Sequence, residues 1–68
     1  MKITKDMIFI QRDGGKEYRV IRLNEFKNSN GYPLISMQCD KPLSIVTLIT
    51  ADLETKIDIP GSAWRLKK

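Results

Sequence analysis

The sequence contains no histidine and a single cysteine, Cys39, which removes much of the chemistry that proteins build from side chains. One cysteine cannot form an internal disulfide, and without histidine it cannot supply the four ligands of a structural zinc site. Nucleophile pairs of the Ser-His and Cys-His type are excluded on the same ground. We therefore predict no metal site, no cofactor and no catalytic residues. A small secreted chain usually needs several disulfides, so the single cysteine favours a reducing, cytoplasmic compartment.

Long hydrophobic runs are also missing. The apolar stretches fall far short of the roughly 20 residues that a membrane helix needs. The first residues turn charged again before any apolar run of signal-peptide length. The 68 residues are expected to form one domain, residues 1–68, because so short a chain buries only about 60% of its unfolded surface. These features predict one small folded domain that does not contact a membrane.

Helical periodicity is missing as well. No window repeats apolar residues at helical spacing, whereas β-branched and aromatic residues are frequent. The chain is therefore expected to form short strands. The strongest local pattern is a hairpin in which strands at residues 7–12 and 16–23 flank a turn at residues 13–15, where two glycines can adopt positive φ.

The predicted hairpin also implies a register. A three-residue turn sets Ile10 opposite Tyr18 and Ile8 opposite Val20, and this pairing gathers the four side chains on one core face. Between Val20 and Ile21 the apolar side chains change from one face of the strand to the other. Such a flip predicts a bend or bulge that allows a small sheet to curl.

The rest of the chain continues as strands and turns. Residues 24–31 are mostly polar and end in an Asn-Gly turn pattern, so they are expected to form the longest loop. Three segments have strand-like alternation, at residues 32–39, 43–50 and 55–59, and the second of them is apolar on both faces. Turns are expected at residues 40–42 and 51–54. Residues 63–66 suit a short closing strand or a 3₁₀ turn.

Five or six short strands joined by tight turns predict an all-β fold, a small antiparallel SH3-like barrel. Closure of the barrel would remove the strand edges that an open sheet exposes. The predicted core consists of one face of the strands and a terminal tryptophan: Ile8, Ile10, Tyr18, Val20, Ile35, Met37, Ile45, Ile57 and Trp64. Cys39 shares the face of Ile35 and is expected to be a small buried side chain.

The charge gives the first indication of function. Twelve Lys and Arg against eight acids make a formal net charge of +4, and basic side chains gather around the first hairpin. We predict a site there that follows a single-stranded phosphate backbone and stacks a base, made of Arg12, Lys16, Tyr18, Arg19 and Arg22. Acidic residues lie among the basic ones. An ordinary solvated surface with cross-strand charge pairs is therefore the alternative interpretation.

An aromatic residue in a polar segment gives a second candidate site. Phe26, beside Lys27, could anchor a protein partner, although a lone loop aromatic more often folds back over the core. We expect this folded-back position for Phe26. Trp64 is likewise expected to pin the C-terminal segment to the barrel.

The acids near the end of the chain do not indicate a cation site. Asp52, Glu54 and Asp58 are fewer than the oxygen ligands of a calcium loop, and the fixed turn glycine of such a loop is missing. A solvated hairpin explains them.

Two non-enzymatic functions remain from the sequence. The first is weak binding of single-stranded DNA or RNA through the basic hairpin. The second is a protein-binding adaptor or inhibitor, for example an accessory protein of a phage or mobile element that blocks a host factor. Its partner would engage an exposed strand edge or the segment 24–31, and the protein itself would be a monomer or a homodimer. Small barrels serve both functions, so the fold class alone does not separate them.

Overall fold

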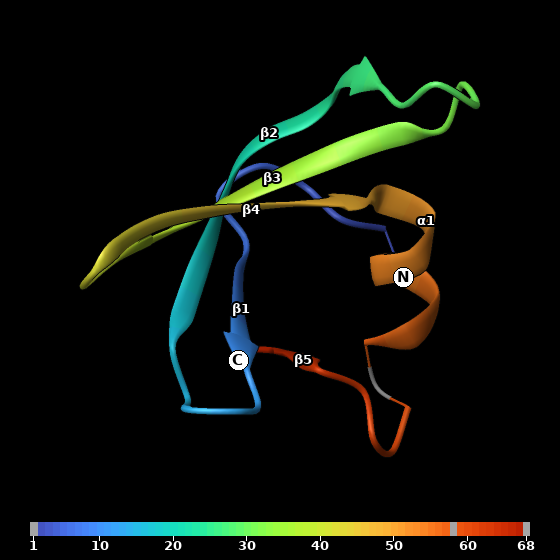
Figure 1. The fold of residues 1–68 in the computed structure, drawn as a ribbon. Coiled ribbons are helices and arrows are strands. Elements are labelled where there is room, and N and C mark those ends of the chain that lie inside the picture. Colours follow the sequence, from blue (N-terminus) through green and yellow to red (C-terminus); the bar gives the residue numbers. More distant parts are fainter. Residues whose placement is uncertain (1, 58, 68) are drawn as a thin grey trace.

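The computed structural model describes residues 2–57 and 59–67. Within them the chain forms five strands and one helix: β1 (Ile8–Gln11), β2 (Glu17–Lys27), β3 (Pro33–Asp40), β4 (Leu43–Ile49), α1 (Thr50–Lys56) and β5 (Trp64–Leu66). Neighbouring strands are antiparallel, in the order β4-β3-β2-β1-β5 (Figure 1). The predicted all-β antiparallel class is confirmed. In the described residues β4 and β5 are the two edges of the sheet and do not pair, so closure into an SH3-like barrel is not confirmed.

The first hairpin has a longer turn than predicted. The backbone N–H of Gln11 donates to the carbonyl oxygen of Lys16 at 2.8 Å, which leaves four residues, 12–15, in the turn. Gly14 and Gly15 have φ angles of 89° and 68°, so the predicted positive φ is present at both. The predicted three-residue turn is wrong, and with it the register.

The extra turn residue brings the other face of β1 into the core. Phe9 pairs with Tyr18, and Ile8 pairs with Arg19. Phe9 is completely buried, whereas Ile8, which was predicted in the core, is only partly buried. A slip of one residue exchanges the two faces of a strand, and for this reason Phe9 rather than Ile8 occupies the centre of the core. Ile10, which was also predicted in the core, is buried, with 9% exposure.

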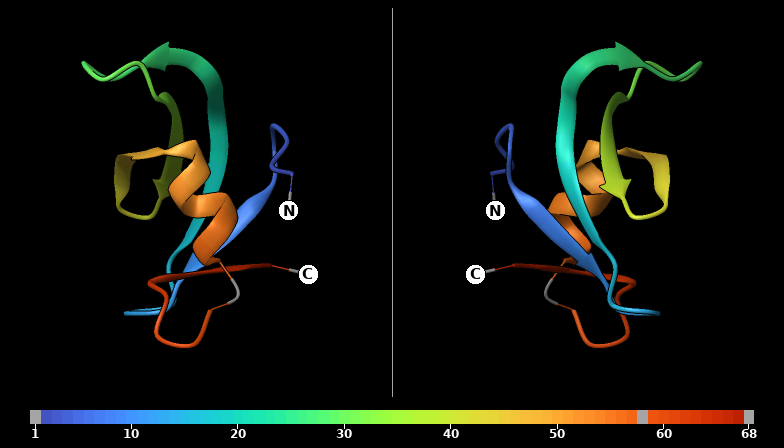
Figure 2. Two further views of the ribbon diagram at one scale, coloured as in Figure 1. Left: turned by 90° about the vertical axis from the view of Figure 1, so that its right-hand side faces the viewer. Right: turned by 90° about the vertical axis from the view of Figure 1, so that its left-hand side faces the viewer.

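Strand β2 is longer than predicted and strongly bent. It is eleven residues long and continues past its predicted end at residue 23. Its pairing with β3 shifts register between Val20 and Arg22, where the sequence predicted a bend or bulge, and that prediction is confirmed. Figure 2 shows β2 arching over the molecule. The predicted long loop at residues 24–31 is wrong, because its first half belongs to β2.

A side chain shortens the connection between β2 and β3. The Oδ1 atom of Asn28 accepts hydrogen bonds from the backbone N–H groups of Asn30 and Tyr32, each at 3.0 Å. Gly31 has a φ angle of 83°, so the predicted Asn-Gly turn is present. Because the Asn28 amide imitates a backbone acceptor, the chain reverses within a few residues.

The next hairpin, β3–β4, places a different face of β4 inward than the sequence indicated. The inward side chains of β3 are those predicted and are buried: Ile35, Met37 and Cys39. Val46 of β4 pairs with Met37, and Val46 and Leu48 pack against the core. Ile45, predicted in the core, is 58% exposed. The prediction failed because β4 is apolar on both faces, so its alternation does not distinguish the inner face from the outer one.

Helix α1 replaces the turn predicted at residues 51–54 and the start of the strand predicted at residues 55–59; Asp58 in that segment lies outside the described residues. Thr50, Leu53 and Ile57 have helical spacing and are nearly completely buried. The predicted absence of helix is therefore wrong. Burial of this short face holds the helix, since seven residues alone are too few for a stable helix in water.

Strand β5 ends the fold and pairs with β1, in agreement with the predicted closing strand at residues 63–66. The buried apolar core is Ile3, Phe9, Ile10, Tyr18, Val20, Ile35, Met37, Cys39, Leu53 and Ile57. Of these, the sequence did not single out Ile3, Phe9 and Leu53. Trp64 is partly buried against the core.

Alanine substitutions at one isoleucine of β3 and one of β4 test which face of each strand points into the core. We expect Ile35→Ala to lower the free energy of unfolding by about 2–5 kcal/mol, because the side chain is completely buried. Ile45→Ala should cost less than about 1 kcal/mol, because Ile45 remains largely exposed in the folded chain. Denaturant unfolding of both variants measures the difference. Equal costs would contradict the orientation of β4.

Candidate functional site

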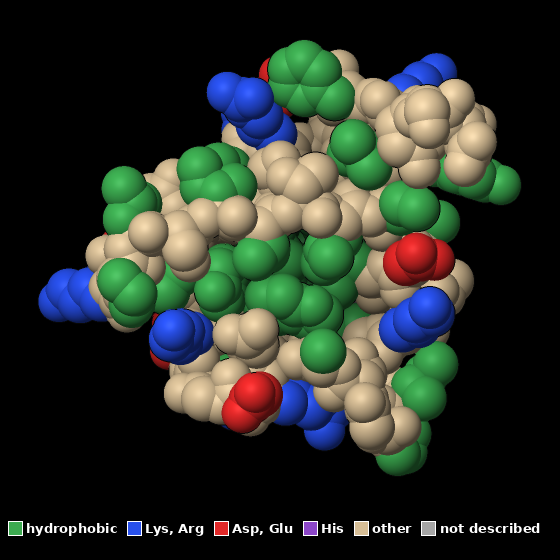
Figure 3. All heavy atoms as spheres, viewed as in Figure 1, with side chains coloured by type: hydrophobic (Ala, Val, Ile, Leu, Met, Phe, Trp, Pro, Cys, Tyr) green, Lys and Arg blue, Asp and Glu red, His purple; other side chains and the backbone are tan. Residues whose placement is uncertain are grey.

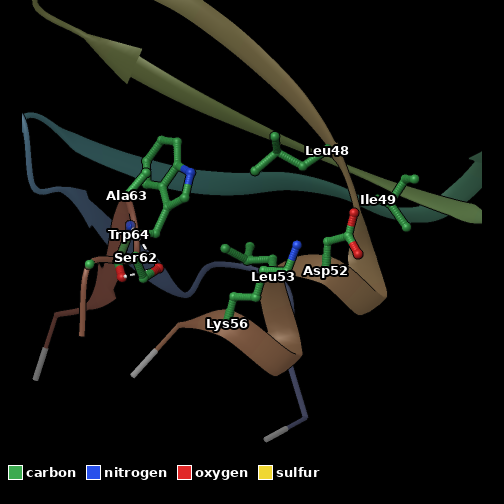
Figure 4. Close-up of a pocket in the computed structure, with 9 residues that line it drawn as sticks. Leu48, Ile49, Asp52, Leu53, Lys56, Ser62, Ala63 and Trp64 are labelled. Carbon is green, nitrogen blue, oxygen red and sulfur yellow. Dashed lines mark hydrogen bonds between the residues drawn. The ribbon is translucent and has the colours of Figure 1, made fainter. Parts of the chain in front are cut away.

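A pocket lies between the two edges of the sheet, where the barrel would have closed. Its volume is about 340 Å³, and β4, α1 and the segment leading into β5 all contribute to its walls. Figure 3 shows apolar side chains in the hollow at the centre of this face, and Figure 4 shows the pocket from close by. The lining residues are Leu48, Ile49, Asp52, Leu53, Lys56, Gly61, Ser62, Ala63 and Trp64. We call this the edge pocket.

Trp64 forms a wall of the edge pocket and is held firmly in place. Its ring meets the ring of Tyr18 edge to face, with centroids 5.1 Å apart and planes at 85°. The Tyr18 hydroxyl lies 3.3 Å from the Ser44 hydroxyl of β4 and shares a hydrogen bond with it. The predicted role of Trp64 as a pin for the C-terminal segment is confirmed. Because Trp64 is only partly buried, part of its ring faces the pocket.

The two strands that border the edge pocket differ in how open their edges are. On β5, the Ser62 hydroxyl accepts a hydrogen bond from the backbone N–H of Trp64 at 3.3 Å and lies 3.2 Å from its carbonyl oxygen. The Ser62 side chain thus occupies main-chain groups that a new strand would need. On β4, residues 43–49 are all uncharged. Leu43 is 71% exposed and Ile45 is 58% exposed. We refer to the free side of β4 as the β4 edge.

The structure does not support base stacking at the predicted nucleic-acid site. Tyr18 is only 5% exposed and packs against Trp64, so its ring cannot stack on a base, and this predicted role is wrong. Arg19 is exposed, and its Nη1 atom lies 3.6 Å from an oxygen of Asp6, which partly neutralises its charge.

The other basic residues of that site are spread along the hairpin. Arg12 and Lys16 are exposed and flank the first turn. Arg22 is exposed and lies beyond the register shift. Because a strand rises about 3.3 Å per residue, Arg22 is roughly 20 Å along the strand from Lys16. These residues therefore form no compact cluster. Their binding role stays a prediction.

A different group of aromatic and basic side chains gathers at the far end of β2 and at the turn that follows. Phe26 is 58% exposed, so the predicted folded-back position is wrong. The guanidinium carbon of Arg22 lies 5.5 Å from the centre of the Phe26 ring, within cation–π distance. Lys27 is exposed, and Tyr32 is 54% exposed. We call Arg22, Phe26, Lys27 and Tyr32 the hairpin tip.

The sequence analysis predicted no cation site among the acids near the end of the chain, Asp52, Glu54 and Asp58. Among residues 2–57 and 59–67, no group of three His, Cys, Asp or Glu side chains is arranged to hold a metal ion. Asp58, one of the acids considered, lies outside these residues. In the same part of the chain, no helix is long and apolar enough to cross a membrane.

Comparisons with protein-family models, with curated proteins and with solved structures found no match. The candidate sites therefore rest on their own geometry, and the edge pocket is the more concave of them.

Sequence reasoning missed this pocket because its walls come from three separate segments. The helical spacing of Leu53 and Ile57 is the local pattern that could have indicated the helix, of which Leu53 lines the pocket.

Trp64 and Phe26 were both expected to pack against the core, but their replacement by alanine should change the free energy of unfolding by different amounts. Trp64→Ala should lower the free energy of unfolding by about 2–4 kcal/mol, because Trp64 packs on Tyr18 and the core. Phe26→Ala should cost less than about 1 kcal/mol, because it removes only an exposed ring and its contact with Arg22. Thermal unfolding of the two variants checks this. A larger loss of stability for Phe26→Ala than for Trp64→Ala would indicate that Phe26 folds back over the core after all.

Proposed function

We propose that this chain is a small, non-enzymatic protein-binding module, an adaptor or inhibitor whose partner adds an extended segment to the β4 edge. The observation that carries this proposal is the uncharged, open β4 edge, with exposed Leu43 and Ile45, directly beside the edge pocket. Soluble proteins normally protect a free edge with lysine, proline or a covering element, because an unprotected edge pairs with other strands. Addition of a strand to such an edge is a common mode of peptide recognition.

The geometry suits a strand with alternating side chains. Successive side chains of an added strand point to opposite faces of the sheet. One set would enter the edge pocket between Leu48 and Trp64, and the other would lie on the outer face beside Ile45. The pocket, at about 340 Å³, is at the lower end of the size range of ligand pockets, which begins near 300 Å³. The backbone supplies affinity and the pocket supplies selectivity for apolar side chains.

The proposal includes the SH3-like fold and the cytoplasmic location expected from the sequence. The order β4-β3-β2-β1-β5 and the bent β2 support this proposed fold, with the sheet open between β4 and β5. A partner strand on β4 would fill part of this opening. A cytoplasmic location is supported by Cys39, the only cysteine, which is free and buried.

A display library of random linear peptides, selected on the dilute protein, tests this function. We expect enriched peptides to alternate apolar and polar residues, because only alternate side chains can reach the edge pocket. Ala63→Arg should abolish their binding by filling the pocket from an exposed position. Ala51→Arg is the matched control, since Ala51 is also exposed and does not line the pocket. Peptides that bind Ala63→Arg as well as the parent protein would count against the proposal.

We propose weak binding of single-stranded nucleic acid as a second candidate function, transferred from the predicted hairpin site to the hairpin tip. The observation that favours it is the exposed Phe26 ring with the Arg22 guanidinium 5.5 Å from its centre, next to exposed Lys27 and Tyr32. Exposed aromatic rings stack on bases, and neighbouring cations neutralise phosphates. The Arg12 and Lys16 side chains would contribute only at longer range.

Fluorescence anisotropy with a labelled single-stranded oligonucleotide, at low and high salt, tests this second function. Arg22→Gln should lower the log–log salt slope by about 0.7, the contribution of one neutralised phosphate. Phe26→Ala should weaken binding about tenfold or more at every salt concentration, because it removes stacking. Arg65→Gln, at an exposed position on β5 away from the hairpin tip, serves as the control and should change neither. An absence of binding at low salt would eliminate this function.

A further inference from the structure

We propose that the strand that pairs with the β4 edge is β4 of a second copy of this chain, so that the protein is a homodimer with a continuous intermolecular sheet. This inference rests on the proposed function, since it names the partner of the same edge. It follows from three properties of β4: its lack of charge, its symmetry in an antiparallel pair, and the opposite charges at its two ends.

The lack of charge permits β4 to pair with itself. Like charges directly opposite each other destabilise a strand pair, and an edge lysine or glutamate would meet its own copy or a close neighbour in a symmetric dimer. Leu43–Ile49 contains only Leu, Ser, Ile, Val and Thr. These seven residues therefore carry nothing that opposes self-association.

An antiparallel pair centred on Val46 covers the exposed apolar side chains. In this register Val46 lies opposite the partner's Val46, Ile45 opposite the partner's Thr47, and Leu43 opposite the partner's Ile49. The outer-face side chains of Leu43 and Ile45, 71% and 58% exposed in the single chain, thereby gain cross-strand neighbours. A dimer thus partly shields two of the five large hydrophobic side chains that the described residues expose.

The two ends of β4 carry complementary charges. Lys41 precedes the strand in the tight turn, and Asp52 follows it in the first turn of α1; both are exposed. In an antiparallel pair centred on Val46 the beginning of one β4 meets the end of the other, which places Lys41 opposite the partner's residue 51, next to the partner's Asp52, and Asp40 opposite that same Asp52. The acid beside Lys41, Asp40, already accepts a hydrogen bond from Gln38 of its own chain at 2.8 Å. Lys41 thus lies beside both acids, Asp40 and the partner's Asp52, and opposes their repulsion at each end of the interface.

The alternative of a head-to-tail contact between β4 and the β5 edge of another copy is less favourable. β5 has only three residues, and Ser62 occupies the main-chain groups of Trp64. A head-to-tail contact would also extend into a ring or a filament, whereas the symmetric β4 pair closes after two chains.

Sedimentation velocity over a wide range of protein concentration tests the dimer. We expect a reversible shift from monomer to dimer. Ile45→Lys should raise the dimer dissociation constant at least about tenfold, because it places two lysines in one interface. Phe26→Lys is the matched control: Phe26 has the same 58% exposure, receives the same charge, and lies at the hairpin tip away from the β4 edge. Thermal unfolding of both variants verifies that they remain folded.

A disulfide test measures the register. In a Cys39→Ser background, Val46→Cys should form a covalent dimer on mild oxidation, because residues directly opposite in an antiparallel pair have Cα atoms about 4.5–5.5 Å apart, within disulfide range. Phe26→Cys in the same background should remain mostly uncrosslinked.

The outcomes separate the dimer from the proposed function. A dimer that Ile45→Lys disrupts and Phe26→Lys preserves supports the inference. A dimer that persists in Ile45→Lys, or that fails to crosslink at residue 46, overturns it. A strict monomer that still selects peptides through the edge pocket overturns the dimer and leaves the proposed function standing. A strict monomer that selects no peptides overturns both.

Discussion

The bend in β2 is the constraint on which the rest of the structure depends. The beginning of β2 pairs with β1 and its later part pairs with β3, and the register shift after Val20 turns the strand between these two partners. One strand can therefore belong to both halves of a curled sheet. The curl brings Phe9 of β1 and Ile35 of β3 into one core, although these strands do not pair with each other. It also carries the ends of the sheet, β4 and β5, toward the same side of the molecule.

The small size of the chain explains why those ends remain apart. The largest fully buried side chains among the described residues are Phe9, Val20, Ile35 and Met37. Helix α1 adds Leu53 and Ile57 to the core and fills part of the space between β4 and β5. The part that it does not fill is the edge pocket. A chain of this length covers only a limited share of its apolar surface, and the uncovered share lies where a partner strand would fit.

Local patterns predicted the features that one strand or one turn decides alone. The inward face of β3 follows from the simple alternation of its apolar residues. The bend in β2 follows from the point where its apolar residues change from one face of the strand to the other. The edge pocket could not be predicted in this way, because its walls come from segments that meet only after the sheet has curled. Helix α1 escaped detection because its buried face consists of Thr50, Leu53 and the residue just after the helix, Ile57, which is too short a pattern to stand out among strands.

The sequence by itself determined that the chain is all-β, that histidine-based and multi-cysteine chemistry is excluded, and that the sheet bends within β2, because each depends on residue types or local spacing alone. Only the tertiary structure decided which faces of β1 and β4 point inward and that Phe26 is exposed. Both strands are apolar on both sides, so either orientation satisfies the local pattern. The choice is made by packing against neighbouring strands, and one additional residue in the first turn was enough to reverse it for β1.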